Sequence, residues 1–213
     1  MNASSNPNQQ LNHFDILLCL LLASAIPSIA RSADNKPTLS PSPSLVGDRL
    51  EFSDFNGKSY SLKASVEQRA LVLIFVTTDC PIANSYQPLL ARLYKEFQDK
   101  GFEFALIHEG PNQTLEKLKE HSAEYSVPFS VVMDAEHSIA RTAGATKTPE
   151  VFVFGNDGAI LYQGRIDDLH QGFGKKRAAV SREDLRIALR ELDSGEIIRV
   201  PKTEAVGCSI QLK

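Results

Sequence analysis

An unbroken apolar segment at residues 70–76, ALVLIFV, constrains the fold of this chain more than any other feature. Its length and its β-branched residues fit a strand that is covered on both faces of a sheet. The next long apolar pattern has helical spacing and predicts a helix from Pro81 to Gln98, with Gly101 as its stop. A buried strand that leads through a short turn into a long helix indicates an α/β protein.

Strands and helices alternate along the rest of the chain. Two hairpins are expected where Asn-Gly and Asp-Gly turn signals separate short apolar runs. Ser181 and the Asp three residues later are in capping order and predict the start of the last helix. This alternation argues for a central mixed sheet with helices on both faces. The expected elements, in chain order, are a hairpin of strands 49–55 and 58–62, strand 70–76, helix 81–98, strand 102–107, helix 114–125, strand 129–133, helix 137–143, a hairpin of strands 151–154 and 160–163, and helix 181–194.

Residues 1–30 predict a secretory signal peptide. Residues 14–30, FDILLCLLLASAIPSIA, form an apolar stretch that is broken by Pro27 and ends in small residues. The lack of Lys and Arg before it and the presence of Asp15 depart from that pattern, so an uncleaved membrane anchor is the alternative. We therefore expect an exported protein, periplasmic in a bacterium, whose mature form has no membrane span.

Composition predicts the remaining boundaries. Residues 31–44 are rich in Ser and Pro, which is typical of a flexible linker. A single domain is expected over residues 45–200, followed by a tail at residues 201–213 that carries Cys208. The formal net charge of −3 gives no electrostatic reason to expect a nucleic-acid partner.

Cys80 is the candidate nucleophile. It stands between the apolar strand and the predicted helix, where free backbone N–H groups and the helix dipole favour a thiolate. Thr77 is placed to donate a hydroxyl hydrogen bond to the sulfur, and Pro81 suits the first helical turn. The carboxylate of Asp79 acts against a thiolate, and the alternative interpretation is a buried, inert cysteine.

A second signal is the dipeptide Thr148-Pro149, which directly precedes an expected strand. A proline that enters a strand indicates a tight turn or a cis peptide bond, with a plain loop proline as the alternative. Removal of a signal peptide would leave Cys80 and Cys208 as the cysteines of the mature chain. Two cysteines in an oxidising compartment favour a disulfide.

These motifs resemble the thioredoxin-like superfamily: a strand, Cys-Pro at a helix start, Thr-Pro before a strand, and an Asp-Gly hairpin. More closely, the chain is similar to the redoxin branch, the alkyl hydroperoxide reductase/thiol-specific antioxidant (AhpC/TSA) group. The segments VGDRLEFSDFNGKSYSLKAS, TPEVFVFGNDGAILYQGRIDD and TEAVGCSI resemble exported bacterial redoxin-domain proteins. The resemblance spans residues 45–210 and implies a thioredoxin-like three-layer α/β/α sandwich with a mixed central sheet and an N-terminal β-hairpin.

The resemblance also implies a thiol oxidoreductase in which Cys80 attacks a disulfide or another oxidant. Cys208 is its candidate resolving thiol, and a free or intermolecularly paired tail cysteine is the alternative. Pro149, if cis, would shape with Thr148 and Pro81 the groove in which a substrate backbone lies. The expected partners are protein or small-molecule thiols and disulfides, with peroxides as a further candidate, and no cofactor is expected.

Departures from the family motifs argue against some of the activities found in this superfamily. Ala83 stands where thioredoxins have a second cysteine, so a vicinal dithiol is absent. Leu73 and Pro149 stand where peroxiredoxins have a proline and an arginine, which argues against an efficient peroxidase. Asn84 replaces the second cysteine of Sco-type copper-delivery proteins. A Sco-like copper metallochaperone and a non-catalytic thioredoxin-fold binding module are the two alternative functions.

The histidines are assigned secondary roles. His108 ends the second core strand and is a candidate for a minor role at the site, whereas His121 and His137 are expected on helix surfaces. A metal site would have to combine Cys80 and Cys208 with His108 or His170. No metal is expected.

Overall fold

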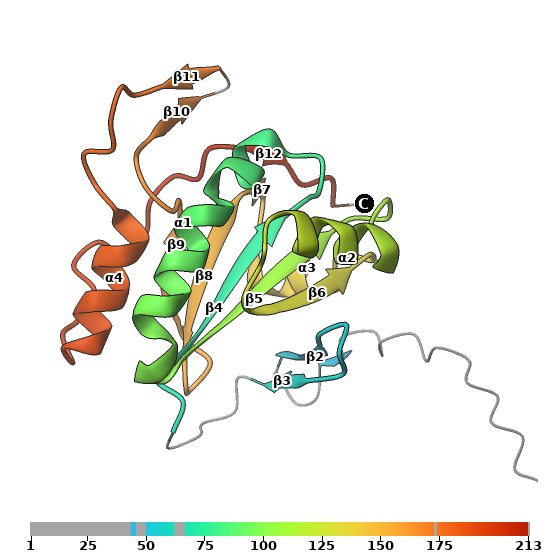
Figure 1. The fold of residues 1–213 in the computed structure, drawn as a ribbon. Helices are drawn as coiled ribbons and strands as arrows, with labels where there is room; N and C mark the ends of the chain where they lie inside the picture. The colour runs from blue at the N-terminus through green and yellow to red at the C-terminus, as the bar shows by residue number, and fades with distance from the viewer. Residues whose placement is uncertain (1–43, 46–49, 62–66, 173, 213) are drawn as a thin grey trace, which may run out of the picture. The chain divides into compact units, whose positions relative to one another are not determined.

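A mixed five-stranded sheet forms the centre of the computed structural model, which describes residues 44–45, 50–61, 67–172 and 174–212 (Figure 1). The predicted signal peptide lies outside the described residues, as does nearly all of the predicted linker. The order of the strands is β6-β5-β4-β8-β9, with β4–β5 and β5–β6 parallel and β4–β8 and β8–β9 antiparallel. The bounds are β4 Ala70–Val76, β5 Phe102–Glu109, β6 Ser130–Asp134, β8 Glu150–Gly155 and β9 Ile160–Gly164.

Strand β4 lies in the middle of this sheet, and all seven of its residues are buried. Its side chains alternate between the two faces. One set, which includes Ile74, packs with apolar side chains of helices α1 (Pro81–Phe97) and α4 (Asp184–Asp193). The other set, which includes Leu73, packs with helix α3 (Ser138–Ala143). The apolar segment is therefore a strand covered on both faces, as predicted.

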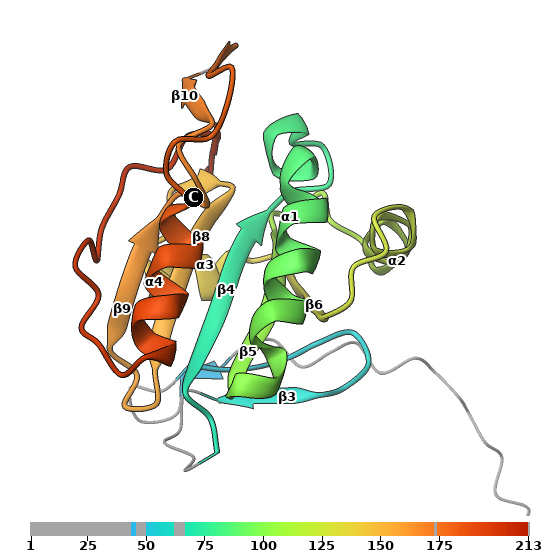
Figure 2. The same cartoon turned by 60° about the vertical axis from the view of Figure 1, so that its left-hand side comes forward.

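Helices flank the sheet in three layers, which confirms the predicted fold class. Figure 2 shows α1 and α4 side by side on the near face of the sheet. Helix α2 (Leu115–Glu124) adds Leu118 to the core on that same face. Thr114 caps α2 by accepting a hydrogen bond from the backbone N–H of Lys117. The layers thus follow from two separate apolar cores, one on each face of the sheet.

The N-terminal hairpin is formed by β2 (Leu50–Ser53) and β3 (Ser59–Ser61), with β1 (Ser44–Leu45) at its edge. The Asp54 carboxylate closes the turn by accepting hydrogen bonds from the backbone N–H groups of Asn56 and Lys58, each at 2.9 Å. Phe52 and Tyr60 place their rings in the core on the α3 side of the sheet.

Two helix ends differ from the prediction. Helix α1 ends at Phe97 and continues as one 3₁₀ turn, Gln98–Lys100, before Gly101 ends it in the left-handed region at φ +81°. Helix α4 begins at Asp184 rather than at Ser181. The reason is that the Ser181 hydroxyl and backbone N–H both donate to the carboxylate of Asp168, so this side chain does not cap the helix.

Two short strand pairs lie beside the main sheet. Strand β10 (His170–Gly172) pairs with β11 (Lys175–Lys176), and β7 (Lys147–Thr148) pairs with β12 (Cys208–Ser209). The chain after α4 runs along β9 before it reaches β7. At β9 the Gln163 N–H donates to the Pro201 carbonyl oxygen and the Thr203 N–H donates to the Gln163 carbonyl oxygen, each at 2.9 Å. Within the part of the chain that the structure describes, no helix has both the length and the apolar character needed to cross a membrane.

Candidate active site

Cys80 occupies the N-cap position of α1, with φ −86° and ψ 107°, and Pro81 follows at the first helical position. Strand β4 fixes the residue from one side, and the helix fixes it from the other through a backbone hydrogen bond from Asn84 N–H to Cys80 O of 3.0 Å. The side chain is 1% exposed. Its thiol donates to the carbonyl oxygen of Thr148 at 3.2 Å. Cys80 is therefore held rigidly at the junction of strand and helix.

The Thr148-Pro149 peptide bond is cis, which confirms one of the two structures expected for this dipeptide. The turn that carries it is held by Glu150, a buried residue whose carboxylate accepts hydrogen bonds from the backbone N–H groups of Thr146 at 2.7 Å and Lys147 at 3.1 Å. This arrangement directs the Thr148 carbonyl toward the Cys80 sulfur.

The tail brings the second cysteine to the same place. Strand β12 pairs antiparallel with β7, so that Cys208 lies opposite Thr148 and Ser209 opposite Lys147. A Cβ atom at Gly207 would lie 1.9 Å from the Thr148 carbonyl oxygen, so the chain approaches this closely only because residue 207 is glycine.

The two sulfur atoms are 3.3 Å apart, and the Cys208 thiol donates to Cys80 Sγ. Both cysteines are free thiols in the structure. Two residues separated by 128 positions in the sequence thus form one dithiol site.

Burial and several neighbouring groups shift the pKa of the Cys208 thiol. Burial raises its pKa most, followed by the neighbouring Cys80 and the carboxylate of Glu109, whereas the ammonium group of Lys147 lowers it. The net result is a raised pKa, so Cys208 remains a thiol at neutral pH and is available as a hydrogen-bond donor to Cys80. The Lys147 ammonium group also donates to the Ser209 hydroxyl at 2.9 Å, which fixes it beside the tail.

Thr77 does not make the contact expected from the sequence. Among the described residues the hydrogen-bond partners of the Cys80 sulfur are Thr148 and Cys208. Thr77 instead accepts the Cys80 backbone N–H through its carbonyl oxygen at 3.3 Å, and its side chain lines a neighbouring pocket. The turn between β4 and α1 uses the backbone of Thr77 to hold Cys80, which leaves the hydroxyl on the pocket side.

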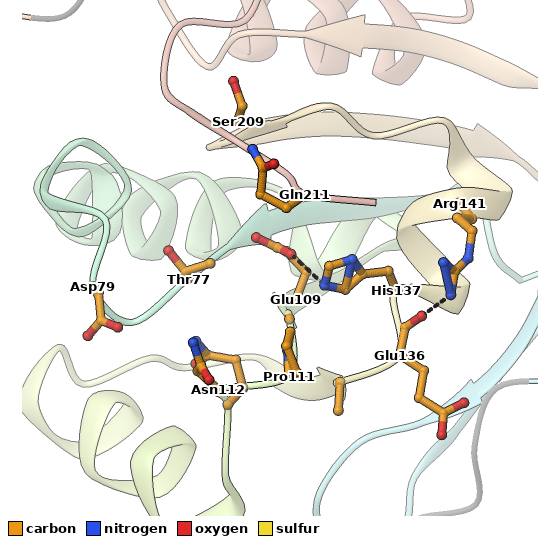
Figure 3. A pocket seen from close by; sticks show the side chains of 13 residues that line it. Thr77, Asp79, Glu109, Pro111, Asn112, Glu136, His137, Arg141, Ser209 and Gln211 are labelled. Carbon is orange, nitrogen blue, oxygen red and sulfur yellow. Dashed lines mark hydrogen bonds and ion pairs between the residues drawn. The ribbon is translucent and has the colours of Figure 1, made fainter. Parts of the chain in front are cut away.

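That pocket has a volume of about 740 Å³ and is lined by the loops after β4, β5 and β6 together with the tail. Figure 3 shows the Glu109 carboxylate and the His137 ring turned toward each other near Ser209 and Gln211 of the tail. His137 Nε2 lies 3.3 Å from Glu109 Oε2. Burial, together with the charge of Asp134, raises the pKa of Glu109 to about 7. The pocket therefore contains a carboxyl group whose charge changes near neutral pH.

The expected surface positions of His121 and His137 are wrong, because both side chains are buried. His137 adopts a left-handed backbone conformation at φ 58° just before α3, which turns its ring inward toward Glu109. His121 Nε2 forms a hydrogen bond with Asn84 Oδ1 at 2.9 Å. The His121 ring packs edge-to-face with the His108 ring. Asn84 thus has a structural partner at the position where copper-delivery proteins carry a cysteine.

His108 is fully buried, and burial lowers the pKa of its imidazole to about 3. His170 packs edge-on against Tyr86. Among the described residues, no three His, Cys, Asp or Glu side chains are grouped so as to hold a metal ion. The combination of Cys80 and Cys208 with His108 or His170, considered from the sequence, is therefore not among such groups in the described part of the chain.

Sequence reasoning missed three residues at the site: Glu109, His137 and Glu150. All three side chains are buried and polar, and Glu109 and Glu150 stand at strand ends, where a charged residue borders an apolar run. A charged residue directly before or after a buried strand is the signal that marks Glu109 and Glu150. His137 carries no such signal, because its burial depends on a backbone conformation that histidine adopts only occasionally.

Comparison with known proteins places these features in a family. A model of the AhpC/TSA family matches residues 46–163. The chain is 26% identical over 119 residues to a protein described as thiol-disulfide oxidoreductase ResA from Bacillus thuringiensis subsp. konkukian (strain 97-27). It is 27% identical over 111 residues to a protein of the same description from Bacillus anthracis. These segments cover 56% and 52% of this chain and 61% and 62% of the relatives. The chain thus spans about three fifths of the length of the curated relatives it matches.

Solved structures extend the similarity over more of the chain. A hypothetical protein from Sinorhizobium meliloti 1021 is 25% identical with a TM-score of 0.66, covering 84% of this chain and 97% of that protein. An uncharacterized conserved protein from Geobacillus kaustophilus gives the same identity and TM-score, covering 84% of this chain and 94% of that protein. The family model, the motifs and the fold agree, and the chain belongs to the AhpC/TSA family, the redoxin branch of the thioredoxin-like superfamily.

Proposed function

We propose that this protein is a thiol-disulfide oxidoreductase with Cys80 as its nucleophile and Cys208 as its resolving thiol. The observation that carries the proposal is the 3.3 Å separation of the two sulfur atoms, both present as free thiols. The tail is held in this position by strand pairing with β7, so the approach of the two cysteines belongs to the fold of the domain. The relatives described as thiol-disulfide oxidoreductases support the same chemistry.

The reaction runs in two exchange steps. In the first, the Cys80 thiolate attacks one sulfur of a substrate disulfide, forms a mixed disulfide and releases the other substrate sulfur as a thiolate. In the second, the Cys208 thiolate attacks Cys80 Sγ, forms the Cys80–Cys208 disulfide and releases the second substrate thiolate. Two electrons pass from the cysteine pair to the substrate, and the two protons lost by the pair are taken up by the released thiolates. An external dithiol returns the pair to its reduced form.

The positions of the two cysteines support these two roles. Cys80 stands at the N-terminus of α1, directly before its first turn, and it is the fixed member of the pair. Cys208 has a raised pKa and its thiol points at Cys80, so it donates a hydrogen bond until it is needed for the second step. The cis Thr148-Pro149 turn contributes the carbonyl oxygen that accepts a hydrogen bond from the Cys80 thiol in the reduced protein.

Thiols and disulfides are favoured over peroxides as substrates. Leu73 and Pro149 stand where peroxiredoxins have a proline and an arginine, and Leu73 is buried in the sheet core. Neither side chain has a group that could polarise a peroxide oxygen. We also propose that the protein is exported, on the basis of the signal-like residues 1–30. The proposed parts that follow are a linker at 31–44, a domain at 45–200 and a tail at 201–213.

The proposal is tested by reacting the reduced protein with excess glutathione disulfide and following the intact mass. A chain with Cys19→Ser keeps Cys80 and Cys208 as its only thiols and should form an internal disulfide with no retained glutathione. The same chain with Cys208→Ser should stop at a mixed disulfide on Cys80, located by peptide mapping. A stable glutathione adduct on the chain that retains both cysteines would contradict Cys208 as the resolving thiol, and the absence of any reaction would contradict the oxidoreductase itself.

A further inference from the structure

The proposed nucleophile is closed to partners in this structure. Cys80 is 1% exposed, and its sulfur contacts the Thr148 carbonyl oxygen and the Cys208 sulfur. A substrate sulfur has to approach Cys80 Sγ directly in order to exchange with it. The segment in the way is the tail, so the tail has to move before an external disulfide reaches Cys80.

The tail binds its own domain in the way an added strand binds a sheet edge. Cys208 pairs with Thr148 and Ser209 with Lys147 in antiparallel register, and Ile210 N–H donates to the Thr146 carbonyl at 2.9 Å. An extended peptide that pairs with an exposed strand edge makes this same pattern of backbone hydrogen bonds. The backbone groups of β7 at this edge are therefore matched to an extended strand.

Two side-chain positions of the tail determine how it fits. Residue 207 has to be glycine, because a Cβ atom there would lie 1.9 Å from the Thr148 carbonyl oxygen and 2.5 Å from its carbon. Ile210, two residues after the cysteine, is 8% exposed and packs with the core that contains Ile139 and Ala140 of α3. Alternate residues of an extended strand face opposite sides, and Ser209 and Gln211 accordingly line the pocket that holds Glu109.

We infer that the tail occupies the docking edge for partner polypeptides, and that a partner binds there as an extended segment with a cysteine in the place of Cys208. The segment has glycine before the cysteine and an apolar residue two positions after it, as the tail does in Gly207-Cys208-Ser209-Ile210. The tail leaves the edge when such a segment binds. This inference rests on the proposed function, since it names the class of substrate for the same site.

The accessibility of Cys80 tests the role of the tail without any redox reaction. In a full-length chain with Cys19→Ser and Cys208→Ser, Cys80 is the only thiol, and its alkylation by iodoacetamide reports how often the site opens. Adding Gly207→Ala forces the tail away from Thr148 and should raise the alkylation rate at least about tenfold. Adding Ile210→Ser instead removes the apolar anchor and should raise the rate in the same direction.

Gly172→Ala is the matched control, because a Cβ atom at Gly172 meets no atom closer than 4.0 Å. This variant should alkylate at the rate of the parent chain, and circular dichroism should give the same spectrum for all four chains. Equal alkylation rates in the Gly207→Ala, Ile210→Ser and Gly172→Ala chains would overturn the inference that the tail closes the site.

A peptide tests the docking edge itself. A synthetic peptide with the sequence of residues 203–212 and serine for its cysteine should slow the alkylation of Cys80 in the Gly207→Ala chain. The same peptide with valine at its glycine position should have no effect, because its side chain would meet the Thr148 carbonyl. Equal effects of the two peptides, or no effect of either, would contradict the docking of an extended partner on β7. These rates do not depend on disulfide exchange, so a failure here is distinct from a failure of the glutathione reaction.

Discussion

The two cysteine-bearing segments of this protein are held in opposite ways. Cys80 follows β4, a strand whose residues are all buried, and begins a helix of 17 residues. Cys208 lies on β12, a strand of two residues that pairs with β7. Next to it, Gly207 packs closely against the Thr148 carbonyl and the side chain of Ile210 packs in the core. From this contrast we expect one sulfur to stay fixed in the core and the other to be able to move with the tail. A resolving thiol needs this mobility, and a nucleophile needs a fixed position.

The largest effect should separate the two cysteines by activity. Cys80→Ser removes the proposed nucleophile, and we expect turnover of a disulfide substrate to fall by roughly a thousandfold or more. Cys208→Ser leaves the first step intact, so a single equivalent of substrate thiol should be released at a rate close to that of the unchanged chain. A rapid-quench measurement of released thiol distinguishes the two. Equal loss of the first released equivalent in both variants would contradict the different roles of Cys80 and Cys208.

The second contrast concerns stability. Leu73→Ala opens a cavity in the fully buried strand β4 and should lower the free energy of unfolding by about 2–5 kcal/mol. Ile210→Ala should lower it by less than about 1 kcal/mol, because the tail detaches locally while the domain remains folded. Urea unfolding followed by circular dichroism measures both. A cost for Ile210→Ala as large as that for Leu73→Ala would mean that the tail is part of the cooperative core.

A pH effect should distinguish the pocket beside the tail. The pKa of Glu109 is about 7 in the folded protein and near 4.5 in an unfolded chain, so the folded state binds the proton more tightly. The free energy of unfolding should therefore fall as the pH rises from 4.5 through 7, by about 1–3 kcal/mol from this group. Glu109→Gln removes the ionisation and should flatten the dependence. Urea titrations of both chains at pH 5 and pH 8 measure it, and parallel curves would contradict the assignment.

The smallest effect concerns the charges around Cys208. Lys147 lowers the pKa of this thiol, and Glu109 raises it. In a chain with Cys19→Ser and Cys80→Ser, Lys147→Gln should move the midpoint of the pH dependence of Cys208 alkylation upward by a few tenths of a pH unit. Glu109→Gln should move it downward, and Lys147→Arg should leave it in place. Midpoints that move in the same direction in the Lys147→Gln and Glu109→Gln chains would contradict the opposite effects expected of the two charges.

Elements with a strong local pattern could be predicted from the sequence. The strand at residues 70–76 and the helix after it have unambiguous apolar patterns, and Cys80 lies at their junction as expected. The capping pattern at Ser181 predicts the wrong start for α4, because the Ser181 hydroxyl donates to the carboxylate of Asp168, thirteen residues earlier in the chain. The burial of His121 depends on Asn84, and that of His137 on Glu109, partners that local patterns do not reveal.

The position of Cys208 marks the limit of sequence reasoning at the site. Its approach to Cys80 depends on a strand pairing between β12 and β7, two strands of two residues each that are separated by about sixty positions. Strands this short have no periodicity to read. The glycine before the cysteine is the one local signal, and its meaning becomes clear only with the Thr148 carbonyl in place.

The measurement that tests the account most directly is the redox equilibrium of the cysteine pair. The protein with Cys19→Ser is equilibrated in defined ratios of reduced and oxidised dithiothreitol, trapped with an alkylating agent and analysed by mass and peptide mapping. We expect one two-electron transition between a form with two alkylated thiols and a form with a Cys80–Cys208 disulfide. Two free thiols at every ratio, or a disulfide between separate chains, would contradict it.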